Sequence, residues 1–361
     1  MTIASIFFFA LRRKIGLRQR LVLAQALSFD QISGVVGLVR NVLLGTLAVE
    51  GAGALILMLR FWPEFGLGRA VWYGMFHSVS AYCNAGFDVL GDLASGGSLC
   101  GYVDDPVVNL TIMALITIGG LGFAVWGDIR KNRRFSRLSV YSRLVVAISL
   151  GLTLGGAAVI ALLEWNNPGT IGGLTAGGKV LASLFQSVTL RTAGFASFDQ
   201  NALRDVTKAV CDVLMFVGGS SGSTAGGVKT VTVGVLVLAA VGTARGRTHI
   251  TAFKRTIPQS TVANAGSIAL LMLTLGAVGA GTIAVIDGVS FENAIYETIS
   301  ALCTVGLTTG ITSGLGLASC LILIIFMFFG RVGIMTISVG FMMANPAEDR
   351  ITYAQTRVMI G

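Results

Sequence analysis

The sequence has little charge and little proline. Only 12% of its 361 residues are charged, whereas soluble domains carry about 25%. Such a chain has too few charges to cover a water-facing surface, which excludes an ordinary soluble globule. Five prolines beside 48 glycines, with no Gly-X-Y period, exclude a proline-rich linker and a collagen.

Cysteine and histidine are also scarce. The five cysteines contain no CxxC pair and are odd in number, so neither a disulfide framework nor a zinc site is indicated. Two histidines leave almost no ligands for metal chemistry. His77 lies beside an apolar run and is interpreted as a packed or interfacial side chain without a catalytic role.

Apolar residues make up 54% of the chain and gather in stretches long enough to cross a hydrocarbon core, which takes roughly 20 residues. The expected spans are 38–60, 106–127, 144–164, 205–242 with an interruption, 263–286 and 315–344. The net charge of +9 would suit nucleic acid if the basic residues shared one soluble face, but they lie between the spans. We therefore expect membrane lipid as a partner and no nucleic acid.

The connections between the spans alternate in charge. Basic residues cluster in 12–40, 130–143 and 245–255, which the positive-inside rule places in the cytoplasm. The acidic connections contain half-hydrophobic stretches near 70–87, 170–195 and 288–307. Non-helical backbone at membrane depth is tolerated where it lines a water-filled cavity. The pattern predicts an all-α polytopic membrane protein built from units of helix, re-entrant pore loop and helix.

The pore loops repeat in sequence. Residues 77–87 align without a gap on residues 297–307, and residues 186–195 form a third copy that is one residue shorter. The glycines near the ends of the copies, Gly86, Gly194 and Gly306, recur at nearly equal intervals. Repeats of this size predict a pseudo-fourfold arrangement around an ion pore in which the first unit is incomplete.

The start of the chain agrees with an incomplete first unit. Met1-Thr2-Ile3 resembles Met335-Thr336-Ile337 in the last span, and the basic cluster follows the apolar run, unlike in a signal peptide. The expected segments are the tail of the incomplete first repeat (1–11), a cytoplasmic basic segment (12–37), the second repeat (38–129, pore loop 74–87), a cytoplasmic loop (130–143), the third repeat (144–243, pore loop 180–195, gating loop 217–229), a cytoplasmic loop (244–262), the fourth repeat (263–345, pore loop 295–307) and a cytoplasmic tail (346–361).

The loop ends have the composition of a cation filter. A dehydrated alkali cation needs a cage of oxygens, which backbone carbonyls supply when their peptides point inward. Glycine permits the positive φ that this requires and leaves the axis open. The alternative is glycine-mediated helix packing. The candidate ion-binding residues are Cys83, Asn84, Ala85, Gly86, Arg191, Thr192, Ala193, Gly194, Cys303, Thr304, Val305 and Gly306, the last three being similar to the Thr-Val-Gly of potassium channels.

A run of small and hydroxyl residues interrupts the span 205–242. It is not a Walker A phosphate loop, because Val228 separates Gly227 from Lys229. Such residues hold a helix poorly, so a flexible loop that blocks or clears the pore is expected, the alternative being a glycine-rich helix contact. The candidate gating residues are Gly218, Gly219, Gly222, Ser223, Thr224, Gly226, Gly227 and Lys229.

Arg331 lies inside the last span, where a charge costs roughly 2.5 to 3.5 kcal/mol. We expect it to face the pore below the filter, where it would limit flux or pin the gating loop. The alternative is a charge paired with a carbonyl or an acid.

On these motifs the chain resembles the Trk/Ktr/HKT potassium transporters, and most of all their Ktr-type membrane subunit. The matching residues are Cys83 to Phe87, Arg191 to Phe195, Cys303 to Leu307, Arg13 to Leu17 and Val358 to Gly361. The resemblance implies K+ uptake across the bacterial plasma membrane, by a multi-pass protein whose four helix-loop-helix domains each give a glycine to the filter. It also implies a homodimer on a cytoplasmic nucleotide-binding ring, the Ktr A-type subunit, with no cofactor in this chain beyond the transported K+ or Na+.

Other functions stay open at this point. A sodium-selective or non-functional truncated homologue is one alternative, and sodium dependence of K+ uptake is undecided. A secondary transporter with broken helices would have inverted repeats, whereas every loop here enters from the acidic side. An intramembrane enzyme needs a nucleophile with a base, or metal ligands, in facing spans. The sequence offers neither, so no enzyme is expected.

Overall fold

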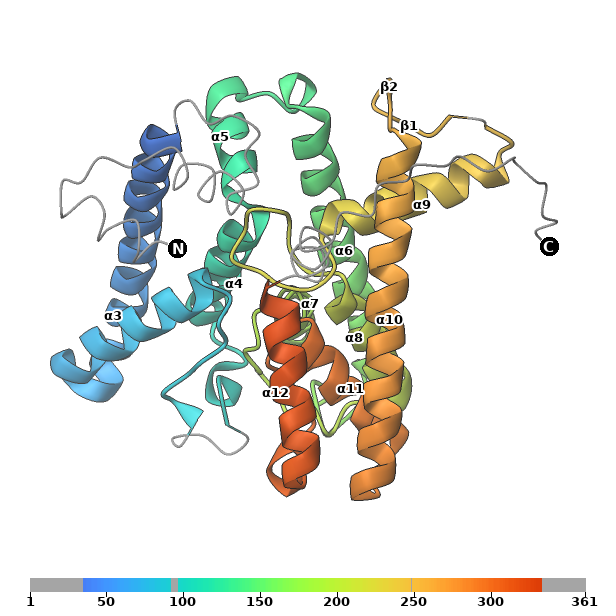
Figure 1. Cartoon of the computed structure of the whole chain (residues 1–361). Coiled ribbons are helices and arrows are strands. Elements are labelled where there is room, and N and C mark those ends of the chain that lie inside the picture. The colour runs from blue at the N-terminus through green and yellow to red at the C-terminus, as the bar shows by residue number, and fades with distance from the viewer. Residues whose placement is uncertain (1–34, 92–96, 248, 333–361) are drawn as a thin grey trace.

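The computed structural model describes residues 35–91, 97–247 and 249–332, and this part of the chain is mostly helical (Figure 1). The helices are α3 (Val35–Tyr82), α4 (Pro106–Leu121), α5 (Phe123–Asn132), α6 (Val140–Glu164), α7 (Ala176–Thr189), α8 (Asp205–Phe216), α9 (Thr230–Ala244), α10 (Gln259–Asp287), α11 (Phe291–Leu302) and α12 (Leu317–Val332), with 3-10 turns at η2 (Cys100–Tyr102), η3 (Phe135–Arg137) and η4 (Ile311–Gly314). A small hairpin, β1 (Thr251–Ala252) with β2 (Arg255–Thr256), connects α9 to α10. The all-α class is confirmed, while the pseudo-fourfold arrangement stays a prediction.

Several expected segments lie outside the described residues. These are the tail 1–11, nearly all of the basic segment 12–37, the inner end of the last span beyond 332, and the tail 346–361. The expected spans that are described coincide with helices. Among the described residues, α3, α6 and α10 are long and apolar enough to cross a membrane, and α9 and α12 are shorter apolar helices.

A long helix followed by a short one is the recurring element of the fold. In the third and fourth repeats these pairs are α6 with α7 and α10 with α11. In the second repeat, α3 contains both the long and the short helix. The two are separated by a sharp turn at Gly66, where φ is 75° and ψ is 163°. Figure 1 shows α3 descending, turning and running back toward the centre. A side chain at Gly66 would be strained at this φ, so glycine sets the position of the turn.

The short helices α7 and α11 each begin directly after a residue whose side chain caps the first turn. Thr175 accepts from Gly178 N at the start of α7, and Ser290 accepts from Asn293 N at the start of α11. These caps satisfy backbone N–H groups that have no partner within the helix. α7 begins at Ala176 and α11 at Phe291, so each short helix starts a few residues before the expected pore loops 180–195 and 295–307 and forms most of their length.

Among the described residues, the expected spans 106–127 and 205–242 are both interrupted. The expected span 106–127 is broken at Gly122, where φ is 88°, and α5 leaves α4 at an angle of 94°. A φ of this sign cannot continue a right-handed helix, so the chain must change direction there. The span 205–242 is broken between Phe216 and Thr230, as its composition predicts.

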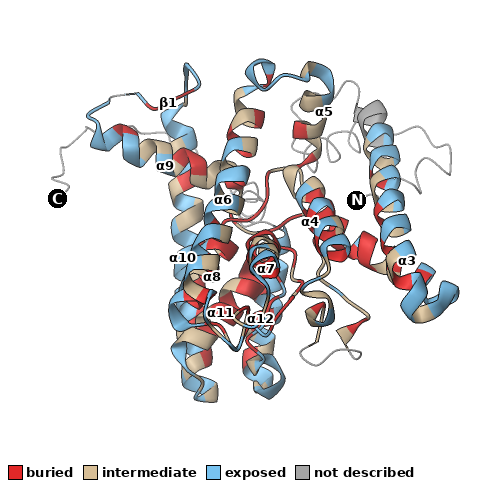
Figure 2. Ribbon diagram, turned by 180° about the vertical axis from the view of Figure 1, so that it is seen from behind, coloured by how far each residue is buried: buried red, intermediate tan, exposed pale blue. Residues whose placement is uncertain are grey.

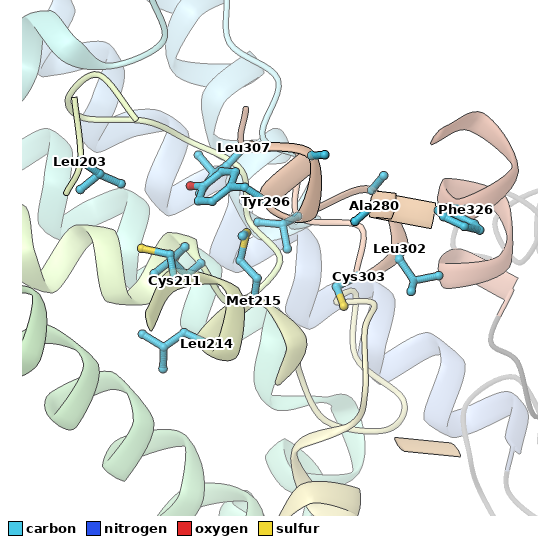
Figure 3. Close-up of a cluster of buried hydrophobic side chains, with 14 of the residues drawn as sticks. Leu203, Cys211, Leu214, Met215, Ala280, Tyr296, Leu302, Cys303, Leu307 and Phe326 are labelled. Carbon is cyan, nitrogen blue, oxygen red and sulfur yellow. The ribbon is translucent and has the colours of Figure 1, made fainter. Parts of the chain in front are cut away.

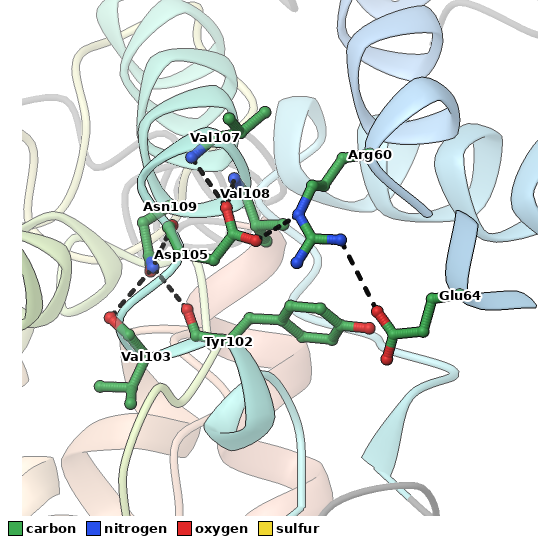
Figure 4. A network of polar contacts seen from close by, with 8 residues as sticks. All are labelled: Arg60, Glu64, Tyr102, Val103, Asp105, Val107, Val108 and Asn109. Carbon is green, nitrogen blue, oxygen red and sulfur yellow. Dashed lines mark hydrogen bonds and ion pairs between the residues drawn. The ribbon is translucent and has the colours of Figure 1, made fainter. Parts of the chain in front are cut away.

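A polar cluster joins the first arm of α3, just before its turn at Gly66, to the start of α4 (Figure 4). Arg60 Nε donates to Asp105 Oδ2 at 2.5 Å, and Arg60 Nη1 lies 3.7 Å from Glu64 Oε2. Asp105 also caps α4 by accepting from Val107 N and Val108 N. The Asp105 carboxylate therefore caps α4 and also binds the first arm of α3 through Arg60.

The core lies among the short helices, and the long helices face outward. Buried positions concentrate in α7, α8 and α11 near the centre of the molecule, whereas α10 is largely exposed (Figure 2). Large apolar side chains such as Leu162, Val285 and Leu317 are about four-fifths exposed. An apolar exterior of this kind suits contact with lipid rather than water. In the core, Tyr296 packs among buried apolar side chains (Figure 3). Its hydroxyl donates to Gln200 Oε1 at 3.1 Å.

Candidate ion filter and intramembrane loop

The loops after α3, α7 and α11 share one backbone conformation. In each, a residue with positive φ stands two positions before a glycine that also has positive φ. The pairs are Asn84 (49°) with Gly86 (71°), Thr192 (64°) with Gly194 (88°), and Thr304 (56°) with Gly306 (93°). A left-handed conformation costs a residue other than glycine roughly 1 to 2 kcal/mol. Its occurrence at three matching positions indicates that the surrounding structure fixes the loops in this shape.

Each loop runs back along its own short helix and is fastened to it by one hydroxyl. Ser80 Oγ donates to Phe87 O at 2.7 Å, Thr189 Oγ1 to Phe195 O at 2.7 Å, and Ser300 Oγ to Leu307 O at 2.6 Å. In all three copies the acceptor is the carbonyl directly after the glycine. That carbonyl is thereby turned toward the helix.

The three glycines meet at one place. A Cβ on Gly86 would lie 2.4 Å from Ala193 O and 2.8 Å from Gly194 Cα, and a Cβ on Gly194 would lie 2.3 Å from Val305 O. A Cβ on Gly306 would lie 3.8 Å from Gly194 Cα. Loops far apart in the sequence thus come together with their backbones in contact. No side chain fits at Gly86 or Gly194, and carbonyl oxygens of neighbouring loops reach these positions.

The inner ends of the loops carry hydroxyl and amide groups. Within the described residues, the hydroxyls of Thr192 and Thr304 are buried without a hydrogen-bond partner. The Asn84 side chain donates to Arg191 O at 3.4 Å, which links the first loop to the second. Cys83 and Cys303 precede these residues at the helix ends, and Cys303 is fully buried.

Residues 217–229 form a loop closed at its neck. Val217 and Val228 form a parallel β-bridge, Gly218 N donates to Val228 O at 2.9 Å, and Thr230 N donates to Gly219 O at 3.0 Å. The non-helical segment coincides with the predicted gating loop 217–229. This loop connects α8 to α9 and, drawn in yellow in Figure 1, crosses the centre of the molecule.

The tip of this loop lies against the inner ends of two filter loops. Thr224 Oγ1 is 3.0 Å from Asn84 Oδ1 and 3.1 Å from Tyr82 O, which accept its hydrogen bond. A Cβ on Gly226 would lie 2.0 Å from Thr304 Oγ1 and 3.1 Å from Cys303 O. The loop therefore covers the inner side of the place where the glycines meet.

Two cationic side chains bind carbonyls of the same loop. Arg331 Nη1 on α12 donates to Thr224 O at 2.6 Å, and Lys229 Nζ donates to Ala225 O at 2.9 Å. Charge-assisted hydrogen bonds are roughly twice as strong as neutral ones. Arg331 is thus paired with a carbonyl, and that carbonyl belongs to the loop beneath the filter.

Arg191 contacts the neck of the loop rather than the filter residues beside it. Its guanidinium lies 3.5 Å from Gly218 O, 3.3 Å from Thr230 Oγ1 and 3.1 Å from Ser149 Oγ on α6. The backbone of Arg191 belongs to the second filter loop, while its side chain joins α6 to both ends of the intramembrane loop. Filter and loop are therefore connected at the neck as well as at the tip.

The hydroxyls of Ser80, Thr189 and Ser300 were not singled out from the sequence. Their signal was present in the repeat alignment, because a Ser or Thr occupies the same place in all three copies. Their partners follow only from the return of the loop along its helix. The Arg191 contacts had no sequence signal, because Ser149 and Thr230 lie in other elements.

Comparison with known proteins adds a family to this geometry. The family model for TrkH, described as a cation transport protein, matches residues 12–353. This chain belongs to that family. The chain is 37% identical to Ktr system potassium uptake protein B of Bacillus subtilis over 361 residues, which cover all of it and 80% of that protein. It is 36% identical to potassium/sodium uptake protein NtpJ of Enterococcus hirae, again over 100% of the chain and 80% of the relative.

A solved structure has the same fold. The crystal structure of the potassium transporter TrkH from Vibrio parahaemolyticus matches with a TM-score of 0.69 at 19% identity, over 89% of this chain and 67% of that one. The protein is therefore a multi-pass membrane protein from a family of cation transporters, not of enzymes. Among the described residues, no group of three or more His, Cys, Asp or Glu side chains could hold a metal ion.

Proposed function

We propose that the protein takes up K+ across the membrane through a pore whose filter is formed by the backbone carbonyls of residues 84–86, 192–194 and 304–306. The observation that carries this proposal is the contact of three loops of identical φ pattern at Gly86, Gly194 and Gly306. Oxygen cages of this kind replace the hydration shell of an alkali cation. The free hydroxyls of Thr192 and Thr304 add ligands at the inner end.

Sodium is the second candidate cargo. The relative from Enterococcus hirae is named a potassium/sodium uptake protein, and it is 36% identical to this chain. In carbonyl cages the preference between the two ions has been ascribed to the size of the cavity and to the number and field strength of the coordinating carbonyl dipoles. Sodium-selective transport, or K+ uptake that depends on Na+, would use the same filter residues.

Substitution of Gly194 tests the filter. The Cβ of Gly194→Ser would enter the space of Val305 O, so the oxygens must move apart or twist. We expect the ratio of K+ to Na+ uptake into proteoliposomes to fall by about tenfold, the change produced by roughly 1.4 kcal/mol. Gly151→Ser is the matched control, because a Cβ at Gly151 on α6 has no neighbour within 4 Å. An unchanged ratio in a folded Gly194→Ser protein would count against the filter assignment.

We further propose that residues 217–229 gate the pore. The support is the position of Thr224 and Gly226 against the inner ends of two filter loops. In this arrangement Arg331 favours the closed state by binding Thr224 O, and its charge lowers the occupancy of cations beneath the filter. Opening requires the tip to leave while the neck, held by Arg191, stays in place.

The assembly proposed for this protein follows the named relatives. Relatives at 37% and 34% identity are called Ktr system potassium uptake protein B, a name that implies further components. We propose a homodimer in the bacterial plasma membrane that binds a cytoplasmic nucleotide-binding ring of the Ktr A type. The repeat boundaries 38–129, 144–243 and 263–345, arranged in a pseudo-fourfold manner, are part of the same proposal.

A further inference from the structure

At one position of each short helix, a side chain contacts the residues that follow the filter loop. In the aligned copies this position is His77, Gln186 or Glu297, on α3, α7 and α11. The side chains of all three are buried, with exposed fractions of 0%, 0% and 5%. Three different polar groups at one buried position require partners, since burying an unpaired polar group is costly.

Glu297 has the most extensive contacts. Its Oε1 accepts from Thr309 N at 3.0 Å and from the Thr309 hydroxyl at 3.4 Å, and also from the Thr308 hydroxyl. Its Oε2 accepts from the Thr312 hydroxyl at 2.8 Å. The donors all lie within six residues after Gly306, on the outward continuation of the filter loop.

The other two copies make the same kind of contact with fewer bonds. Gln186 Nε2 donates to Gln200 Oε1 at 2.6 Å, and Gln200 belongs to the chain that follows the second filter loop. His77 Nε2 is 3.5 Å from Val89 N, three positions after Gly86, while its Nδ1 lies 2.7 Å from Tyr73 O. The ring thus joins the outward chain to the helix backbone.

These side chains complete a set of anchors around each filter segment. In the last copy, Ser300 accepts from Gly306 N at 3.1 Å and donates to Leu307 O, and Glu297 holds the next residues. The chain directly after residues 304–306 is therefore held to α11 at two places, by Ser300 and by Glu297. A fixed outward chain limits how far these carbonyls can move, and with it the spacing of the oxygens around an ion.

We propose that His77, Gln186 and Glu297 are positioning residues that fix the chain after each filter segment and thereby the spacing of its carbonyls. We further propose that Glu297 contributes most to discrimination between K+ and Na+. This rests on the proposed function, because it deepens the role of the same filter. The carboxylate acts through the threonines of the loop, not by touching the ion. Its effect is therefore expected to depend on acceptor geometry more than on charge.

The test compares Glu297→Ala with Glu297→Gln in the full-length protein, by K+ and Na+ uptake into proteoliposomes. Glu297→Ala removes every acceptor, and we expect the K+ to Na+ ratio to fall about tenfold, the change that a difference of roughly 1.4 kcal/mol between the two ions produces. Glu297→Gln keeps the oxygen facing Thr309 N and should stay within about threefold of the unmodified protein, since one acceptor remains. Glu292→Gln is the matched control, because it removes an acid from the same helix outside this contact set.

The outcomes separate the possibilities. If Glu297→Gln is as damaging as Glu297→Ala, the carboxylate acts by its charge and the positioning role is overturned. An unchanged ratio in folded Glu297→Ala overturns it as well. Should Glu297→Ala fail to fold, Thr308→Val and Thr312→Val remove single donors and must lower the ratio in the same direction. If the unmodified protein transports neither ion, the proposed function fails rather than this inference.

Discussion

Single residues decide whether the filter loops can take their shape. Asn84, Thr192 and Thr304 adopt positive φ although they are not glycine, and each lies at the end of a short helix that holds the following residues. The strain is tolerated because hydrogen bonds from one side chain of the helix determine where the chain goes next. Each loop is thus held by its own short helix as well as by contacts with the neighbouring loops.

The Thr189 hydroxyl offers a clean test of this rigidity. Thr189→Val keeps the shape of the side chain but leaves Phe195 O without its partner, which costs about 1 to 3 kcal/mol. Thr189→Ser keeps the hydroxyl and is the matched control. We expect a lower thermal unfolding midpoint and a lower K+ to Na+ ratio for Thr189→Val alone. Equal values for the two variants would show that the hydroxyl has no part in holding the loop.

The repeat alignment singled out Gly86, Gly194 and Gly306 but not the residues that support them. The structure brings these glycines together with positive φ, and their part in a filter stays a prediction. Glu297 and Arg191 could not be assigned contacts from sequence, since their partners depend on the path of the chain after the helix. Arg191 was grouped with the filter on sequence position, whereas its side chain lies at the loop neck.

At the scale of elements, the break that we propose as a gate is the non-helical segment between α8 and α9. Helix starts at α7 and α11 follow from Thr175 and Ser290, which are legible capping signals that place both helices earlier than hydropathy alone does. The break between α8 and α9 was predicted from its small residues. The 94° bend at Gly122 was not, because glycine also occurs inside unbroken helices of this chain, as at Gly151 and Gly155 in α6, and so does not by itself mark a bend.

The intramembrane loop leads to a prediction about flux. Gly226→Ala would place its Cβ 2.0 Å from Thr304 Oγ1, so the loop cannot keep its seat beneath the filter. If the closed state loses about 1.4 kcal/mol, the open population and the K+ flux rise by up to tenfold. Uptake rates in proteoliposomes measure this, with Gly155→Ala on α6 as a control whose Cβ has no near neighbour. A slower or unchanged flux in a folded Gly226→Ala protein would mean that the loop does not block the pore.

At the scale of the whole molecule, repeats of one unit place three loops around a common point, and a segment of the third repeat covers that point from inside. Membership in the cation transporter family agrees with a helical exterior that exposes large apolar side chains such as Leu162, Val285 and Leu317. The class of the fold was predictable, because hydropathy reports it directly, whereas the order of the repeats stays a prediction. How the units turn toward one another depends on packing that periodicity does not encode.

The location of a bound ion tests the proposed pore most directly. Rb+ replaces K+ in oxygen cages and scatters anomalously, so crystals grown in Rb+ would show where it binds. We predict Rb+ between the carbonyls of residues 84–86, 192–194 and 304–306, and loss of that signal in Gly194→Ser. Rb+ bound elsewhere in the membrane region, with this place vacant, would contradict the assignment of the filter.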